Sequence, residues 1–545
     1  PVVRVDHNFS EKHRMFARYS HSDFTGSFDK YDPNTTVRGR LRGRPHRGAA
    51  WDNVFVLNPQ TILSVRYGFT WNKEFQKFDN QGWDLSEFGF PASLLSQLNP
   101  EGITFPDVRS RSMLNLGNDG GFNRTYYTHN LLSTLTWVKG NHSLKFGSDM
   151  RAFFKNDKTF GNVSPRMDFN ETYTRGPLDN AAPAPVGQGI ASMLFGLPDG
   201  GTAAVNDSRA EHTRFAGLYV QDDWRISREL TLNLGLRWEY ESPGTERFNR
   251  GTRNFDFVTV NPIQDQARAA YARSPIPEVP VNQFSTIGGV TFLGIGGNPR
   301  SLRDPDYRAF MPRAGFAYQL TPRTVIRAGY GIFFGMKGSE FYDVAQPGFN
   351  QATSVVASVD TGRTYVGSIS NPLPFGLQRP QGASAGLRTF LGRSPAFYSD
   401  DGRRPYTQRW SYTVQFEPFS RSVIEAGYIG SKTVRADVDT QFSPIPRQYL
   451  STAPVRDQAT INYLTTQAPN PFRGISGFEG ASMATATNVT RAQLLQPYPH
   501  FTGLNAALPA GSSWYNGLTA RFERRMTEGL QFRLSYTWSK NLEAV

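Results

Sequence analysis

The stretch Leu230-Thr-Leu-Asn-Leu-Gly-Leu-Arg-Trp-Glu-Tyr240 decides the fold, because apolar and polar side chains alternate along its whole length. Successive side chains of a β-strand point to opposite faces, so this stretch predicts a strand with one apolar wall and one polar wall. A helix would scatter the same residues around its axis at 3.6 residues per turn. The same alternation recurs at 63–71, 144–154, 326–334 and 530–538.

Short polar turns alternate with long loops between these strands. A typical turn is Lys139-Gly-Asn-His142. The long loops are rich in Gly, Pro, Asn, Asp and Ser, as irregular segments are; they cover about 23–50, 75–125, 156–209, 242–308, 336–405 and 436–513. The hairpins are predicted near 2–22, 51–74, 126–155, 210–241, 309–335, 406–435 and 514–540. This rhythm is typical of an outer-membrane barrel, and it predicts an all-β antiparallel meander of roughly fourteen transmembrane strands with long extracellular loops.

Composition excludes several other classes. No stretch approaches the 18 apolar residues of a membrane helix, and 13% aromatic residues argue against disorder. The chain has no cysteine, so disulfide frameworks and cysteine nucleophiles are excluded. A soluble sandwich would place tryptophan in its core, whereas nearly all the tryptophans here fall near strand ends, as in the aromatic belts of barrels. A propeller would repeat at a fixed period, which these loops do not.

The two ends of the chain carry no targeting signal. Pro1-Val-Val-Arg4 opens directly into strand-like sequence, and the chain stops just after the strand-like run that ends near Trp538. We interpret the chain as an internal fragment, so the missing signal peptide says nothing about where the parent protein resides.

Several segments resemble the barrel of TonB-dependent outer-membrane receptors. The most specific is Tyr219-Val-Gln-Asp-Asp-Trp224 followed by Leu234-Gly-Leu-Arg-Trp238. Other segments that look similar are Asp6–Ser20, His142–Asp149, Pro312–Tyr318 and Val325–Gly331. Within this family, the segments look most similar to the Oar-like receptors, which carry a carboxypeptidase-regulatory-like domain. The resemblance implies a monomeric 22-stranded barrel with a plug and a TonB box. We find neither plug nor box here, so the energy-coupling parts are expected outside this chain.

The resemblance implies TonB-dependent transport of a large solute, such as a siderophore, an oligosaccharide or a peptide. A passive porin or a surface adhesion barrel remains the alternative, and a soluble β-repeat binding module is a third. Because strand number and tilt are linked, we expect the first and last strands to keep unpaired edges in this chain.

One wall of the strands carries charged residues, and this polar wall is predicted to line the lumen, because a charge facing lipid would cost about 2–4 kcal/mol near the midplane. These residues would either contact a plug or solute, or form cross-strand ion pairs that stabilise the wall. They are Arg66, Lys145, Asp149, Arg151, Arg237, Glu239, Arg313, Arg327, Arg409, Glu425, Arg521, Glu523 and Arg533.

A dense basic cluster occupies the first long loop: Arg38, Arg40, Arg42, Arg44 and Arg47. On an outward-facing loop the anionic partner at hand is lipopolysaccharide, although plain solvated charge is the commonest reason for such a cluster. The net charge of +13 is therefore not taken as evidence for nucleic-acid binding.

No enzyme motif is visible. The sequence has no HExxH motif, its histidines lack ligand-like spacing, and no Ser/His/Asp nucleophile pattern appears. Gly329–Gly335 resembles a dinucleotide loop only superficially, because it lies within a predicted strand. The acidic pairs Asp304/Asp306 and Asp400/Asp401 could help bind calcium, but short acidic turns are common. We expect no catalysis, no cofactor and no metal.

Overall fold

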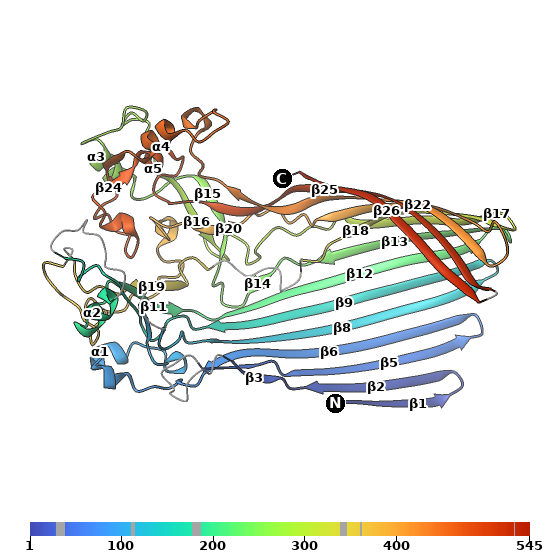
Figure 1. The fold of residues 1–545 in the computed structure, drawn as a ribbon. Coiled ribbons are helices and arrows are strands. Elements are labelled where there is room, and N and C mark those ends of the chain that lie inside the picture. The colour runs from blue at the N-terminus through green and yellow to red at the C-terminus, as the bar shows by residue number, and fades with distance from the viewer. Residues whose placement is uncertain are drawn as a thin grey trace.

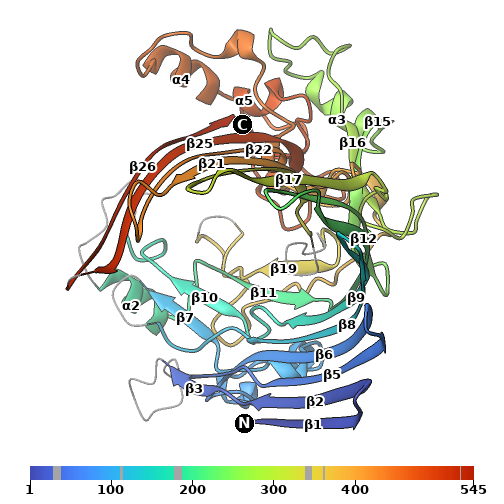
Figure 2. The same ribbon diagram turned by 90° about the vertical axis from the view of Figure 1, so that its right-hand side faces the viewer.

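The computed structural model describes residues 1–28, 39–110, 115–176, 187–337, 346–359, 362–527 and 529–544. Within these ranges the dominant element is an 18-stranded sheet that forms a long curved wall (Figures 1 and 2). Its long strands follow one another in chain order, each antiparallel to the next. They are β1 (Val2–Ser10), β2 (His13–Ser22), β5 (His46–Asn58), β6 (Thr61–Phe78), β8 (Phe122–Lys139), β9 (His142–Thr159), β12 (Arg209–Arg225), β13 (Leu230–Glu241), β17 (Ala309–Thr321), β18 (Thr324–Phe334), β21 (Tyr406–Phe416), β22 (Ser422–Gln441), β25 (Asn505–Thr527) and β26 (Leu530–Ala544). The antiparallel all-β meander predicted from the alternation is thus confirmed.

All the tight turns gather at one end of this wall, and the long connections gather at the other (Figure 1). The turn between β8 and β9 has Gly140 at φ 58°, in the left-handed region that tight hairpin turns require. We call the two ends of the sheet the turn end and the loop end. Short strands extend the sheet at the loop end: β3 (Thr25–Phe28), β4 (Arg40–Gly43), β14 (Thr245–Glu246) and β20 (Ala396–Tyr398).

Several strands run further into the loop end than the sequence predicts. β22 continues to Gln441 and β25 begins at Asn505, whereas the alternation places these boundaries at 435 and 514. Pairing continues from Ala436↔Gly511 to Gln441↔Asn505 after a local register shift. Beyond the apolar band both faces of a strand can be polar, so the backbone ladder continues where the sequence pattern fades.

The wall is open between its first and last strands. β1 pairs with β2 and β26 pairs with β25, and among the described residues no ladder joins β1 to β26. Figure 2 shows the resulting arc, with its two edges apart. The expectation of unpaired edges on the first and last strands is therefore confirmed for this chain.

The two faces of the wall differ in chemistry. We call the face that carries Asp149 and Glu239 the inner face; both carboxylates are buried. The opposite, outer face carries large apolar side chains that no element in the described ranges covers, and they are between 40% and 67% exposed. Exposed apolar rows of this kind fit a lipid environment rather than water. Such residues include Phe146, Leu234, Tyr330, Phe532 and Leu534.

The described parts of the long connections form small sheets, ribbons and helices at the loop end, which we call the cap. A four-stranded sheet consists of β19 (Asn350–Ser354), β11 (Gly200–Asn206), β10 (Arg166–Phe169) and β7 (Asp107–Ser110), and Figure 2 shows it within the arc of the wall. Two small ribbons are β15 (Thr252–Val260) with β16 (Ile287–Phe292) and β23 (Gln467–Pro469) with β24 (Asn488–Thr490). The helices are α1 (Ala92–Leu95), α2 (Gln188–Leu194), α3 (Gln264–Tyr271), α4 (Gln458–Thr465) and α5 (Arg491–Leu495), with 3-10 turns at Leu85–Phe88, Pro100–Gly102, Gly386–Arg388, Arg447–Tyr449 and Ser482–Ala484.

Among the described residues, two large apolar cores and a small one at Leu293 and Leu302 hold the cap together. The larger one surrounds Phe472 and Phe501, which are fully buried, and it joins residues from 255 to 506. The second surrounds Met167 and Phe169 of β10. The hydrophobic cores of this chain therefore lie in the cap, whereas the wall has apolar residues on its outer face and polar residues on its inner face.

Candidate functional site

The inner face of β9, β12 and β13 carries a continuous network of charges. Arg151 Nη2 lies 2.7 Å from Asp149 Oδ2, and Arg237 Nη2 lies 3.2 Å from the same oxygen. Arg237 Nε also donates to Glu239 Oε1 at 2.6 Å. Four residues from the predicted lumen set are thus brought together, and Asp149, only 4% exposed, is paired on both sides. A buried carboxylate needs such partners, because desolvation penalises an isolated charge.

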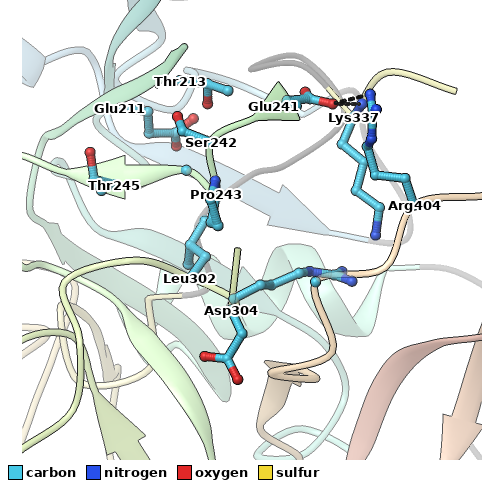
Figure 3. A pocket seen from close by; sticks show the side chains of 13 residues that line it. Glu211, Thr213, Glu241, Ser242, Pro243, Thr245, Leu302, Asp304, Lys337 and Arg404 are labelled. Carbon is cyan, nitrogen blue, oxygen red and sulfur yellow. Dashed lines mark hydrogen bonds and ion pairs between the residues drawn. The ribbon is translucent and has the colours of Figure 1, made fainter. Parts of the chain in front are cut away.

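The network continues into the cap through Arg404, which the sequence does not single out. Arg404 Nη1 lies 3.4 Å from Glu239 Oε2 and 3.6 Å from Glu241 Oε2. The backbone nitrogen of Lys337 also donates to Glu241 Oε2 at 2.8 Å. Glu241, Lys337 and Arg404 line a partly open cavity of about 40 Å³ (Figure 3). Glu241 could have been predicted from the sequence, because it is an odd-numbered residue of β13, as Arg237 and Glu239 are, and therefore lies on the same face.

The Lys337 side chain, which lines this cavity, has a pKa that its surroundings change. Burial lowers the pKa of its ammonium to about 8, and the nearby Arg303 guanidinium acts in the same direction. The carboxylates of Asp437 and Glu241 oppose this lowering of the pKa. The Asp437 carboxylate lies 3.8 Å from Lys337 Nζ. The cavity therefore combines both signs of charge at the junction of wall and cap.

A second charged cluster lies nearer the ends of β8, β9 and β12. Arg124 Nε and Arg209 Nη2 lie 3.0 Å and 3.1 Å from Asp157 Oδ2, and Arg209 Nε lies 3.2 Å from Glu211. Lys155 is 3.8 Å from Glu211. Sequence reasoning missed this cluster because it assigns Arg124, Asp157 and Arg209 to the loops 75–125 and 156–209. Lys155 and Glu211 lie at the ends of predicted hairpins, and all five residues continue the inner-face parity.

Other predicted lumen residues lie on the same face and have partners outside that network, although Lys145 borders a cavity that Arg237 and Glu239 also line. Arg66 Nε lies 2.5 Å from Asp52 Oδ2, and Lys145 Nζ lies 3.5 Å from Asp223 Oδ2. Arg521 and Arg533 both pair with Glu523, the latter at 3.1 Å. A third group spans β18, β21 and β22. In this group Arg327 donates to Gln415, and Gln415 donates to Glu425.

Arg313 and Arg409 differ from the other lumen arginines. Among the described residues neither has a carboxylate within ion-pairing distance; instead their guanidinium carbons lie 4.5 Å and 5.6 Å from the ring centre of Phe333. The register places Arg313, Gly331 and Arg409 in one row across β17, β18 and β21. Most of the predicted set thus forms cross-strand pairs, and these two arginines do not.

The structure divides the basic cluster of the first loop. Arg42 and Arg44 both pair with Glu74, Arg44 Nη2 at 3.0 Å. Arg47 Nη1 pairs with Asp23 at 2.7 Å. Arg40 lies over Phe28, with 5.8 Å between its guanidinium carbon and the ring centre. Arg38 lies outside the described residues.

The acidic pairs considered for calcium have basic partners. Asp304 pairs with Arg253 at 2.5 Å, and Asp401 pairs with Arg403 at 2.5 Å. Within the described part of the chain no group of three or more His, Asp or Glu side chains is placed to hold a metal ion. No helix in the described ranges is both long and apolar enough to cross a membrane.

A protein family and several solved structures match this architecture. Residues 1–544 match the family described as outer membrane beta barrel domain. No curated protein matches the chain. Among solved structures, the outer membrane transporter YddB from Escherichia coli is similar with a TM-score of 0.50 and 10% identity, over 99% of this chain and 48% of its own.

Two further solved structures are similar at lower scores. The copper transporter OprC has a TM-score of 0.44 and 10% identity over 99% of this chain and 53% of its own. The alcaligin outer membrane receptor FauA from Bordetella pertussis has a TM-score of 0.41 and 9% identity over 100% of this chain and 53% of its own. This chain thus spans about half the length of the solved structures it matches.

The family match covers residues 1–544, and the open meander carries an apolar outer face and a charged inner face. The protein therefore resides in the outer membrane, and its chain belongs to the outer membrane beta barrel domain family.

Proposed function

We propose that residues 1–545 form the barrel part of a TonB-dependent receptor of the Oar-like subgroup, which imports a large solute across the outer membrane. The observation that supports this most is the inner-face network from Arg151 to Glu239, which continues through Arg404 into the cap. A polar path of this kind suits the passage of a hydrated solute, and the sequence resemblance points to import driven by TonB.

The proposal places the coupling machinery outside this chain. A plug and a TonB box contributed by the rest of the parent protein would contact the TonB complex, and the parent would act as a monomer. Siderophore, oligosaccharide and peptide all remain within the proposed class of solute, and the chain itself would carry out no catalysis.

We further propose lipopolysaccharide as a partner of the first loop. Arg44 and Arg47 carry side chains that are 57% and 31% exposed even though each is paired with a carboxylate. Exchange of a phosphate for the paired carboxylate would keep the bidentate geometry that arginine favours.

The test is solute uptake by cells that produce the full parent protein, measured with and without a protonophore. TonB-dependent import stops when the proton gradient is removed. We expect uptake of at least one ferric siderophore, oligosaccharide or peptide to require both the protein and the gradient. Uptake that continues after the protonophore, together with steady ion conductance in planar bilayers, would instead establish a passive porin. Binding to surfaces without any uptake would establish an adhesion barrel.

A further inference from the structure

A shallow groove opens on the inner face of β13, β17, β18 and β21, with a volume of about 470 Å³. Pockets that take small organic ligands have volumes of about 300–1,000 Å³. Neither Asp149 nor Glu239 lines this groove. Arg313 also borders a neighbouring cavity that Arg237 and Glu239 line. Among the lining residues of the groove, we call Arg313, Arg409 and Phe333 the rim and Gly235, Gly329 and Ile429 the floor.

The rim carries two positive charges that the described protein does not neutralise. Arg313 and Arg409 flank Gly331 in one row, and a Cβ on Gly331 would lie 3.0 Å from the Phe333 ring. The ring therefore lies over Gly331, and its centre is 4.5 Å and 5.6 Å from the guanidinium carbons of Arg313 and Arg409. Each arginine elsewhere in the predicted lumen set has a carboxylate or amide acceptor, so these two donors are placed for an anion that is not part of the described chain.

The glycines of the groove floor are not required by the conformation of the backbone. Gly235 and Gly329 have no positive φ, and a Cβ at these positions would find its nearest atoms at 3.5 Å and 3.6 Å. A side chain could therefore be accommodated by the sheet itself. Glycine in a strand often marks a place where a ligand approaches the backbone closely. A flat body lying on this floor would make contacts that any larger residue would block.

We propose that this groove binds a small planar organic anion, such as an aromatic carboxylate, whose charged groups pair with Arg313 and Arg409 while its flat body lies on the glycine floor. This deepens the proposed transport function by naming a class of solute, and it rests on that function for its biological meaning. The binding event itself can be tested without transport.

The experiment uses the full chain refolded in detergent and terephthalate as the probe, with binding measured by calorimetry at two salt concentrations. We expect saturable binding that weakens with salt. Combined Arg313→Gln and Arg409→Gln substitutions should reduce the affinity by at least about tenfold, because two charge-assisted contacts are lost. Gly329→Val should abolish binding by filling the floor.

Two matched variants control for folding and for general charge. Arg533→Gln removes another inner-face arginine, and Gly68→Val fills another inner-face glycine, whose nearest neighbour to a Cβ is 3.9 Å away. Both should bind terephthalate as the unmodified chain does. Far-UV circular dichroism and heat-dependent gel migration should show the same folded sheet in every variant.

The inference is overturned if the unmodified chain does not bind terephthalate, if the double arginine variant binds it equally well, or if neutral benzamide binds equally well. Stronger binding of an acetylated Asp-Glu peptide would also overturn it, in favour of a polypeptide occupant. Uptake that fails in cells while terephthalate binding persists would reject the transport proposal alone, so the two failures are distinguishable.

Discussion

Arg237 on β13 reaches Asp149 on β9 across the intervening strand β12, with 3.2 Å between Nη2 and Oδ2. The contact depends on Gly217 of β12, which pairs with Asp149 on one side and with Glu239 on the other. A Cβ on Gly217 would lie 2.6 Å from Arg237 Nη2. The bare backbone at Gly217 therefore leaves room for the Arg237 guanidinium to reach from β13 to the Asp149 carboxylate on β9.

We expect Gly217→Val to break this contact and to lower the free energy of unfolding by about 1–3 kcal/mol, because a buried charge loses a partner. Urea unfolding in detergent measures the change. Gly68→Val is the control, since that glycine has room for a side chain. Equal stability of the two variants would show that the Arg237–Asp149 contact contributes nothing.

The assignment of faces predicts opposite results for two adjacent residues of β13. Leu234 is 42% exposed on the outer face, whereas Asn233 on the inner face donates to Asp223 at 2.6 Å. Leu234→Arg should destabilise the folded state in lipid bilayers by up to about 2–4 kcal/mol, because a charge would face hydrocarbon. Asn233→Arg should cost clearly less, because its charge faces the polar interior. A larger loss from Asn233→Arg in the same bilayer unfolding measurement would reverse our assignment of the two faces.

A substitution at Phe472 tests whether the cap has a cooperative core. Its ring is fully buried and lies 5.2 Å, centre to centre, from Phe478. Phe472→Ala should destabilise the cap by about 3–5 kcal/mol through the cavity that it leaves. Hydrogen exchange should then speed up across α4 and α5, while the long strands keep their protection. Phe375→Ala, at a side chain 74% exposed, is the control and should leave exchange unchanged. Unchanged exchange in the Phe472 variant would argue against a cooperative core.

The buried His500 side chain makes the stability of the cap depend on pH. Burial lowers the pKa of its imidazole to about 3, well below the ordinary value of 6.5. The unfolded cap therefore takes up a proton between about pH 6.5 and pH 3 that the folded cap does not. The free energy of unfolding should fall as the pH decreases through this range.

Limited proteolysis of the cap at pH 7 and pH 4 measures this effect. His500→Gln should remove part of the difference between the two pH values, because glutamine does not titrate. His7→Gln, on the exposed strand β1, should leave the difference as it is. An unchanged pH dependence in the His500 variant would contradict the proposed role of this residue.

Most of the wall could be predicted from the sequence. Alternation in 230–240 fixes which side chains share a face, because that property depends only on the two-residue repeat of a strand. The polar parity likewise places Asp149, Arg237 and Glu239 on one face of the sheet. The chemistry of the two walls is thus a local property, and local properties can be read from the sequence.

The partners of these charges were decided only by the tertiary structure. The contact between Arg237 and Asp149 depends on strand register and on the bare backbone at Gly217, which involve residues far apart in the chain. Arg404 comes from a loop whose sequence has no periodic pattern, and its place beside Glu239 follows from the packing of the cap. The contrast between paired Arg533 and the groove arginines Arg313 and Arg409 arises in the same way. Alternation determines the face on which a residue lies, whereas register and loop packing, which are non-local, determine what it touches there.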